Sequence, residues 1–274
     1  MNREDITLIV GGTGKTGRRV AERLRKLERP VRVASRSAAP AFDWHDDSTW
    51  AAALHGVRAV YLAYYPDLAV PEAAAHIRAF CERAAASGVA RIVLLSGRGE
   101  PGVLPSEAAV RGSGMAYTIL RSAWFNQNFS EGHLLGPVLE GEIAFPAGQV
   151  AEPFVDLDDV ADVAVAALYD DRHAGKTYEL TGPRLLTFAE AAFEITRASA
   201  RDVYYRAVSS AEYARALADF MPGEQVTFLT QLFADVLDGH NAYLGDGVQR
   251  ALGHAPRDFR DFAREAARAG VWTP

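Results

Sequence analysis

ITLIVGGTGKTGRRVAERL, at positions 6–24, is the most informative stretch of this 274-residue sequence. A short apolar strand pattern leads directly into glycines spaced G-x-x-G-x-x-G, and these lead directly into a helical pattern. Gly11 suits a tight turn, Gly14 lets the main chain approach a diphosphate, and Gly17 lets a helix pack closely on a strand. Unpaired N–H groups at the start of the helix attract phosphate. The stretch therefore predicts a Rossmann-type dinucleotide-binding βαβ unit, against the alternative of a glycine-rich turn that only reverses the chain.

The end of the second strand pattern, VRVASRS at 31–37, indicates which dinucleotide is bound. A carboxylate here, about 20 residues after the glycines, would hold the ribose 2′-hydroxyl of NAD. Ser35 and Arg36 occupy the place instead, and a guanidinium suits a 2′-phosphate. We therefore predict NADP(H), with Lys15 as a second positive charge; the alternative is that Arg36 is a solvated surface charge. Asp43 lies where a loop reaches adenine, but it suits the approach to a helix equally well.

The first half of the chain alternates between strand and helix patterns. Its apolar runs are short, rich in β-branched residues and nearly continuous, which is typical of strands buried on both faces of a parallel sheet. Strands are predicted at Ile6–Val10, Val31–Ala34, Ala59–Leu62, Ile92–Leu95 and Tyr117–Leu120. Helices are predicted at Lys15–Leu27, Thr49–Leu54, Glu72–Ala86 and Pro105–Gly112. This order predicts an α/β fold with a doubly wound parallel sheet and right-handed crossovers.

The second half is less regular and richer in helix. Strands are predicted at Glu142–Phe145 and Thr177–Leu180, and helices at Asp158–Leu168, Phe188–Ala198, Ser209–Ala218, Gln225–Leu237 and Phe259–Ala269. We therefore expect residues 1–150 to form the NADP(H)-binding Rossmann core, with 151–182 contributing to its sheet, and residues 183–274 to form a small helix-rich C-terminal substrate lobe. Such a lobe would cover the carboxyl ends of the strands, where open α/β sheets bind ligands.

Several helix boundaries carry local signals. Ser48 is predicted to cap the second helix, and Pro71 to take the first position of the third. Gly88 is predicted to end that third helix. Thr187 and Glu190 have the spacing of a capping box.

The composition argues against several classes of protein. The chain is 49% hydrophobic and 23% charged, with a formal net charge of -6, which argues against binding nucleic acid through its phosphates. The single cysteine, Cys81, allows no internal disulfide and is expected to be buried filler in a helix. The histidines lack metal-ligand spacing, so no metal site is predicted. Charged residues at the N-terminus and the lack of a long apolar run predict a cytoplasmic protein without signal peptide or membrane span.

Longer motifs along most of the chain are shared with a known family. They are GGTGKTGRRV, VRVASRS, the DW of AFDWHDD, VYLAYYP, RIVLLS, YTILRSAWFNQNFSE, PFVDLDDVADVAVAAL, TYELTGP and DGHNAYLGDGVQRALGHAPRDFRDFA. On these motifs the chain resembles the NmrA-like group of atypical short-chain dehydrogenase/reductases, and within it the bacterial relatives of festuclavine and agroclavine dehydrogenases. The pairing of TILR-x-x-WF-x-x-NF with PFVD-x-x-D is far more specific than the glycine loop. The resemblance implies a Rossmann core, a small C-terminal substrate lobe and NADP(H) as the cofactor.

The resemblance also implies roles for particular positions. Those implied to contact the coenzyme are Thr13, Lys15 and Thr16 at the diphosphate, Ala63 and Tyr64 beside the adenosine and the diphosphate, and Ser96 at the nicotinamide. Those implied to wall the substrate cavity are Trp124, Phe125, Asn128 and Phe154. Without the resemblance, an aromatic stretch such as 124–129 is more typical of a core than of a cavity.

The proton donor departs from that of the better-known short-chain dehydrogenases, which use a tyrosine activated by a lysine four residues later. The sequence has no Y-x-x-x-K, and the nearest match, Tyr117 with Arg121, lies in a strand pattern and is expected in the core. The remaining candidates are Ser96, Tyr64 or Tyr65 as proton donors, and Arg98 as the anchor of an anionic group. Each has a simpler interpretation: the serine as a turn residue, the tyrosines as pocket wall or interface surface, and the arginine as a solvated charge.

Residues and resemblance together predict an NADPH-dependent reductase acting on a small molecule of secondary metabolism. Hydride would reach an imine, an enone or a carbonyl group, with the protein contributing position, desolvation and a hydrogen bond. Iminium ions and conjugated enones need less help from a protein acid than simple ketones do. Two alternatives stay open: a non-catalytic NADP(H)-binding sensor that acts through a protein partner, and a non-redox isomerase, cyclase or dehydratase on the same fold. No heptad or apolar stripe in the sequence specifies an oligomer.

Overall fold

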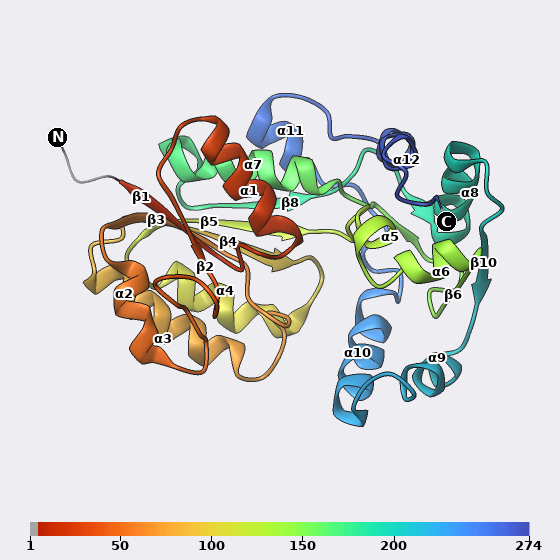
Figure 1. Ribbon diagram of the computed structural model, residues 1–274, viewed down its shortest axis with the longest axis horizontal. Coiled ribbons are helices and arrows are strands. Elements are labelled where there is room, and N and C mark those ends of the chain that lie inside the picture. Colours follow the sequence, from red (N-terminus) through yellow and green to blue (C-terminus); the bar gives the residue numbers. More distant parts are fainter. Residues whose placement is uncertain (1–4, 274) are drawn as a thin grey trace. The chain divides into compact units, whose positions relative to one another are not determined.

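The computed structural model describes residues 5–273 of the chain. These residues form two compact units, each made of three segments (Figure 1). Among the described residues, the first unit contains 5–122, 157–180 and 246–254, and the second contains 123–156, 181–245 and 255–273.

The first unit is built on a six-stranded sheet in the order β2-β1-β3-β4-β5-β8. Its strands are β1 (Ile6–Val10), β2 (Val31–Ala34), β3 (Val57–Leu62), β4 (Arg91–Gly97), β5 (Ala116–Ser122) and β8 (Lys176–Leu180). Every neighbouring pair is parallel. The strand order reverses between β1 and β3, which is the topological switch point of a doubly wound sheet. The predicted fold class is therefore confirmed.

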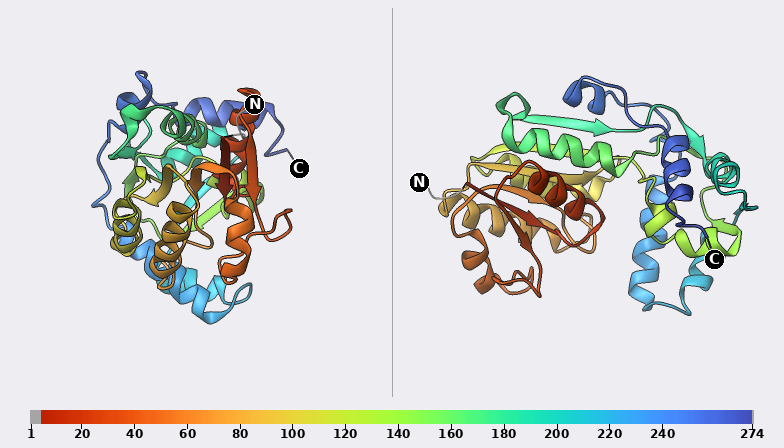
Figure 2. Two further views of the ribbon diagram at one scale, coloured as in Figure 1. Left: turned by 90° about the vertical axis from the view of Figure 1, so that its left-hand side faces the viewer. Right: turned by 45° about the horizontal axis from the view of Figure 1, so that its top comes forward.

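Helices cover both faces of this sheet, as Figures 1 and 2 show. One face carries α1 (Lys15–Lys26), α7 (Leu157–Tyr169) and α11 (Gly247–Leu252), and the other carries α2 (Trp50–Leu54), α3 (Ala73–Ala86) and α4 (Leu104–Arg111). On the second face Ile92 and Leu94 of β4 join a continuous core with Ile77 and Phe80 of α3. Cys81 is 2% exposed in the same core, so its expected role as buried filler is confirmed.

The helix boundaries follow local chemistry, though not always the residue that was predicted. Gly88 has a φ of +86° immediately after the end of α3, as expected of a helix-terminating glycine. The predicted cap at Ser48 is wrong, because the Asp46 carboxylate accepts the Ser48 N–H and starts a short 3-10 turn ahead of α2. Pro71 is not the first helical residue either. A turn in which Ala73 N–H donates to the Val70 carbonyl at 3.1 Å precedes α3.

The second unit is mainly helical. Its helices are α5 (Asn128–Glu131), α6 (Leu135–Glu140), α8 (Phe188–Ser199), α9 (Ser210–Leu217), α10 (Gly223–Val236) and α12 (Phe259–Arg268). Two small sheets accompany them: β6 (Glu142–Phe145) pairs in parallel with β10 (Tyr204–Ala207), and β7 (Ala151–Glu152) pairs in antiparallel with β9 (Leu186–Thr187). The capping box of Thr187 and Glu190 is present at the start of α8, as predicted.

Aromatic rings fill the core of the second unit. The largest fully buried side chains there are Phe129, Phe145, Phe154, Phe188, Phe259 and Trp272. A partly buried ionic group also lies in this unit: Arg184 donates to the carboxylates of both Glu194 and Asp258, each at 2.9 Å or closer, and so joins α8 to the start of α12.

The grouping of segments differs from the division expected near residues 150 and 182. Residues 123–156 pack within the second unit, and α11 packs within the first. At Gly247 of α11, a Cβ would lie 2.7 Å from the carbonyl carbon of Glu179 in β8. This close backbone approach ties a late segment of the chain to the edge strand of the first unit.

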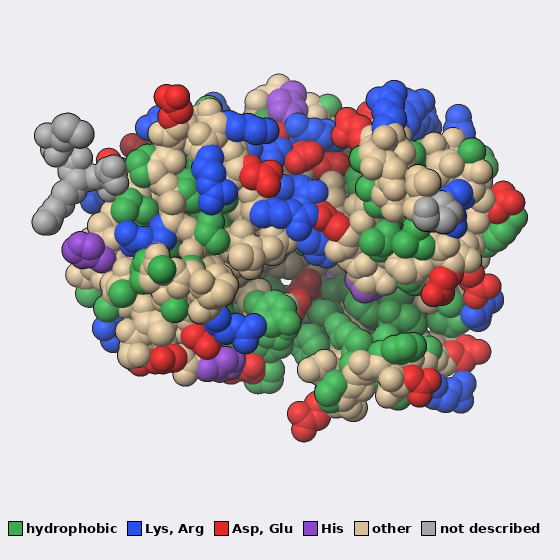
Figure 3. Space-filling model, in the orientation of Figure 1, with side chains coloured by type: hydrophobic (Ala, Val, Ile, Leu, Met, Phe, Trp, Pro, Cys, Tyr) green, Lys and Arg blue, Asp and Glu red, His purple; other side chains and the backbone are tan. Residues whose placement is uncertain are grey.

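The described residues also bear on partners. On the face drawn in Figure 3, acidic and basic side chains are interspersed. Between residues 5 and 273, no helix is both long and apolar enough to cross a membrane. Over the same residues, no three histidine, cysteine or acidic side chains gather as a metal ion would require.

Candidate coenzyme and reaction site

The loop between β1 and α1 has the geometry of a phosphate cradle. Gly11 has a φ of +74°, and a Cβ there would lie 2.6 Å from the Ala63 carbonyl oxygen. A Cβ on Gly17 would lie 2.7 Å from the Gly12 Cα, so the helix rests on the loop itself. A Cβ on Gly12 would lie 2.8 Å from the Ile9 carbonyl oxygen, whereas one on Gly14 would meet only the Gly11 carbonyl oxygen, at 3.2 Å. The loop therefore needs Gly11, Gly12 and Gly17 for its own shape, and the exposed Gly14 is the one left to meet a ligand.

The start of α1 has the features of an anion-binding helix N-terminus. No side chain caps the helix, and its first turn contains no acidic residue. Thr13 and Gly14 are exposed at the crest of the loop, whereas Thr16 is buried behind it at 6% exposure. Burial, and then the charges of Arg18 and Arg19, lower the pKa of Lys15. A bound diphosphate would offset that crowding of positive charge, so these residues fit a dinucleotide.

The end of β2 presents the predicted pair, Ser35 and Arg36. The Ser35 carbonyl accepts the N–H of Phe42 at 2.9 Å, which folds the following loop back on the strand. Arg36 is exposed. Within residues 5–273 no carboxylate pairs with it. Its guanidinium is therefore available to a 2′-phosphate.

Asp43 has a structural role in that loop. Its carboxylate accepts the N–H of His45 at 3.0 Å, and its carbonyl accepts the indole N–H of Trp50 at 2.6 Å. The contact with adenine stays a prediction.

An aromatic group lies beyond β3, around Tyr64. The Tyr64 hydroxyl and Nδ1 of His76 are 2.6 Å apart, and the Tyr64 and Trp44 rings have centroids 4.9 Å apart. Burial, and then the charge of Glu72, raise the pKa of Tyr64 to about 12. Tyr65, the next residue, is 74% exposed. Tyr64 is thus a weak acid that already shares its hydroxyl with an imidazole.

Ser96, at the end of β4, belongs to a buried charged group. Its hydroxyl donates to Oε1 of Glu107 at 2.8 Å. Glu107 is fully buried and accepts Nε and Nη2 of Arg121 at 2.8 and 2.7 Å, and Nη2 of Arg111 at 2.9 Å. Burial opposes ionisation of Glu107, but the hydrogen bonds from Arg121 and Ser96 hold its pKa below the usual range. The Ser96 proton is therefore directed at a carboxylate of α4.

Arg98 is buried rather than solvated, so its interpretation as a surface charge is wrong. The residue is 3% exposed, and its Nε lies 3.3 Å from Oε2 of Glu179 in β8. Its backbone N–H donates to the Ser122 carbonyl at 3.1 Å. Arg98 thus joins the ends of three neighbouring strands.

Sequence comparison decides the family. Residues 11–171 match the family model described as NAD(P)H-binding. The uncharacterized oxidoreductase YesF of Bacillus subtilis is 33% identical over 100% of this chain and 98% of that protein.

The chain belongs to the NAD(P)H-binding family.

Two further relatives indicate the chemistry of this NAD(P)H-binding protein. An agroclavine dehydrogenase of Claviceps fusiformis is 30% identical, covering 97% of this chain and 98% of the relative. An NAD(P)H azoreductase of Xenophilus azovorans is 29% identical, covering 96% and 99%. With relatives of these kinds along nearly its whole length, the chain is an NAD(P)H-dependent oxidoreductase.

Solved structures share the fold of this oxidoreductase. An NADPH-dependent quinone oxidoreductase of Escherichia coli in complex with NADPH has a TM-score of 0.79 at 23% identity, over 94% of this chain and 99% of that one. A mutant of NmrA has a TM-score of 0.71 at 15% identity, over 98% and 97%. The chain therefore has the fold that the resemblance implies, and its similarity to agroclavine dehydrogenases is confirmed.

The residues expected to wall a substrate cavity in this oxidoreductase lie in the second unit. Phe154 is 2% exposed, and its ring packs against those of Phe129, Phe188 and Phe259. Trp124 is partly buried and packs against the rings of Phe145, Phe188 and Phe233, while Asn128 is 8% exposed in α5. Phe125 is partly exposed and bridges to Val155. Their contact with substrate stays a prediction.

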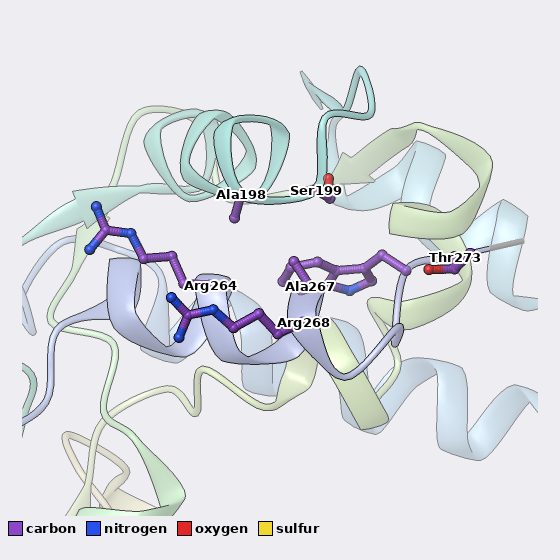
Figure 4. Close-up of a pocket in the computed structure, with 7 residues that line it drawn as sticks. Ala198, Ser199, Arg264, Ala267, Arg268 and Thr273 are labelled. Atoms are coloured by element: carbon purple, nitrogen blue, oxygen red, sulfur yellow. The ribbon is translucent and has the colours of Figure 1, made fainter.

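A pocket in the second unit is lined by residues of α8, of α12 and of the segment that follows α12 (Figure 4). It has a volume of about 270 Å³ between α8 and α12. Its lining residues are Ala198, Ser199, Arg264, Ala267, Arg268, Trp272 and Thr273.

Two acidic residues near the strand ends were missed by sequence reasoning. Glu100 follows β4 and Asp67 follows β3. Burial raises the pKa of both carboxyl groups, and that of Glu100 reaches about 8. The available signal was the position of Glu100 in the glycine-bearing loop GRGEPG, directly after a buried strand.

Proposed function

We propose that the protein is a reductase that prefers NADPH and transfers hydride to a small imine, enone or carbonyl compound. The proposal rests on one observation: an open, uncapped phosphate cradle next to a strand end that offers Arg36 and no carboxylate. Ser35 and Arg36 would hold the 2′-phosphate. Thr13, Lys15 and Thr16 would line the diphosphate, with Ala63 and Tyr64 beside it.

The choice of acceptor follows from the two predicted proton donors, Ser96 and Tyr64, which are weak acids. Ser96 donates to Glu107, and Tyr64 has a raised pKa. Such groups suit acceptors that are already activated, because a conjugated or cationic acceptor needs less protonation than a simple ketone. Relatives named for agroclavine and for azo compounds support an acceptor of this activated kind. Trp124, Phe125, Asn128 and Phe154 would provide the apolar wall.

A panel of acceptors tests the proposal. Purified protein with NADPH would be mixed anaerobically with 2-methyl-1,4-naphthoquinone, an azobenzene dye, a cyclic enone and the 2-methyl-3,4-dihydroisoquinolinium cation. We expect loss of absorbance at the NADPH band above the no-protein rate with at least one acceptor, and slower loss with NADH. Binding of NADPH by calorimetry without turnover of any acceptor would instead favour the sensor. Conversion of a substrate at constant NADPH absorbance would favour an isomerase or cyclase.

A further inference from the structure

The path of the bound coenzyme indicates where the nicotinamide would lie; this inference rests on the proposed function. The phosphate cradle lies at the end of β1, with Arg36 on one side at the end of β2. On the other side the Ala63 carbonyl, at the end of β3, touches Gly11. A dinucleotide with its adenosine over β2 and its diphosphate over β1 must continue past β3 toward β4. The nicotinamide end therefore belongs beside the loops that follow β3 and β4.

Glu100 lies in the loop after β4 and folds back over that strand. Gly99 has a φ of +73°, which turns the chain immediately before it. A Cβ on Gly97 would overlap the Glu100 carboxyl group. The missing side chain at the last residue of β4 thus makes room for this carboxyl at the strand end.

The loop after β3 closes over the same place. A Cβ on Gly102 would lie 3.0 Å from the Ala69 Cβ, so the two loops pack directly together. The Asp67 carboxylate accepts the N–H of Ala69 at 2.8 Å. Asp67 is thereby fixed near Glu100, on which its negative charge acts.

Within residues 5–273 no cation pairs with Glu100. The nearest arginine in sequence, Arg98, pairs with Glu179. Arg111 and Arg121 both pair with Glu107. Burial, and then the charge of Asp67, raise the pKa of Glu100 to about 8. The carboxyl group is therefore protonated in most molecules at neutral pH.

We propose that Glu100, in the loop that folds back over the end of β4, is the general acid of the reductase, and that Asp67 in the adjoining loop is a positioning residue that acts through it. NADPH, when bound, would supply the hydride and leave as NADP⁺. The hydride pair forms a new bond to one end of the acceptor's double bond or conjugated system. The displaced π electrons move to the oxygen or nitrogen at the other end, and that atom takes the proton of the Glu100 carboxyl. Glu100 is left as a carboxylate and regains a proton from water before the next turnover. A cationic iminium acceptor needs no such proton, because hydride addition alone gives a neutral amine.

This difference between acceptors provides a kinetic test. Single-turnover oxidation of NADPH would be followed in wild type, Glu100→Gln and Asp67→Asn with 2-methyl-1,4-naphthoquinone and with the 2-methyl-3,4-dihydroisoquinolinium cation. We expect Glu100→Gln to slow quinone reduction by about 100-fold or more, within the usual range of general acid catalysis, and iminium reduction by less than about 3-fold. Glu82→Gln, on the exposed side of α3, is the matched control and should match wild type.

The pH profile separates a proton donor from a structural residue. Quinone reduction by wild type should fall as the pH rises through about 8, where Glu100 loses its proton. Asp67→Asn should move this fall to lower pH, because the repulsion that favours the protonated form is removed. Glu100→Gln should show no such fall.

A measurement without turnover completes the test. The side-chain carboxyl carbon of Glu100 would be followed by NMR in protein labelled with [5-¹³C]glutamate, with and without NADP⁺, and assigned by its loss in Glu100→Gln. A signal that titrates near pH 8 supports the proposal, and one that titrates near 4.5 overturns it. Equal quinone rates in wild type and Glu100→Gln overturn it as well and leave the proposed function standing. If wild type oxidises no NADPH with any acceptor, the proposed function fails, and the role of Glu100 fails with it.

Discussion

At the scale of a single residue, the proposed preference for NADPH over NADH depends on Arg36. Its guanidinium is exposed at the end of β2 and pairs with no carboxylate of the described chain. Charge-assisted hydrogen bonds are worth about 1.5–3 kcal/mol. Arg36→Ala should therefore weaken NADPH binding by about 10- to 150-fold and leave NADH binding unchanged. Isothermal calorimetry with both coenzymes measures this.

Arg25→Ala provides the control for the loss of one positive charge. Arg25 is exposed in the last turn of α1, away from the cradle, and its removal should change neither affinity beyond about 2-fold. If Arg36→Ala binds NADPH as tightly as wild type does, Arg36 does not read the 2′-phosphate.

Individual site residues were predictable to different degrees. The glycines and Arg36 could be located because each has a fixed spacing from a strand or helix boundary. The partners of Ser96 and Arg98 could not, since Glu107 and Glu179 reach them only after folding. Glu100 was missed for the same reason, because its burial arises where two loops distant in sequence pack together.

At the scale of elements, different glycines of the loop between β1 and α1 maintain its fold and bind the coenzyme. Gly14 has a φ of -78°, which alanine also adopts, and a Cβ there would contact only the Gly11 carbonyl oxygen, at 3.2 Å. Gly14→Ala should keep the free energy of unfolding within about 1 kcal/mol of wild type and yet weaken NADPH binding by at least about 10-fold, because the added methyl group occupies the cradle.

Gly17→Ala is the complementary variant. Its methyl group would press on the backbone of Gly11 and Gly12, and we expect it to lose at least about 1–3 kcal/mol of stability as well as binding. Urea unfolding and calorimetry on both variants test the distinction. Tight NADPH binding by Gly14→Ala would contradict the cradle.

The aromatic core of the second unit leads to a separate expectation. Phe154 is 2% exposed among three phenylalanine rings, so Phe154→Ala should cost about 3–5 kcal/mol of stability. Phe193→Ala, on the same unit but 59% exposed, should cost less than about 1 kcal/mol. Urea unfolding measures both. A small loss for Phe154→Ala would mean that its ring lines a cavity more than it supports the core.

Regular elements of the first unit were predictable because most of its strands contain a short apolar run bounded by a turn. β1 and β2 have the predicted bounds, and β4 extends the predicted run by a residue or two at each end. β10 was missed: its residues 204–207 are mostly exposed, and their pairing partner is β6, far back in the sequence. α5 and α11 are too short to show a helical repeat. Such elements depend on tertiary contacts rather than on local pattern.

At the scale of the whole molecule, opposing pKa shifts predict a stability maximum in weakly acidic solution. Hydrogen bonds from arginines hold the pKa values of Glu107, Glu194 and Asp258 below their usual range, so the stability that these groups contribute is lost as the pH falls below about 4. Glu100 behaves oppositely. Its folded pKa of about 8 exceeds the ordinary 4.5, so its contribution is lost as the pH rises from about 4.5 through 8.

Urea unfolding across pH 3 to 9 tests this expectation. Wild type should lose stability both below about pH 4 and between about pH 5 and pH 8. Glu100→Gln should still lose stability below about pH 4, but its stability should not fall between about pH 5 and pH 8. Parallel curves for the two proteins would show that Glu100 has an ordinary pKa in the folded state.

The chain passes between its two units after Ser122, Asp156, Leu180, Gly245 and His254. No single cut therefore releases a self-sufficient dinucleotide-binding fragment. A piece ending at residue 150 would lack β8, α7 and α11, and would leave β5 as an unpaired edge prone to self-association. Grafting this protein's specificity onto a relative would accordingly require exchange of several inserted segments at once, whereas the proposed coenzyme preference depends on one codon, that of Arg36.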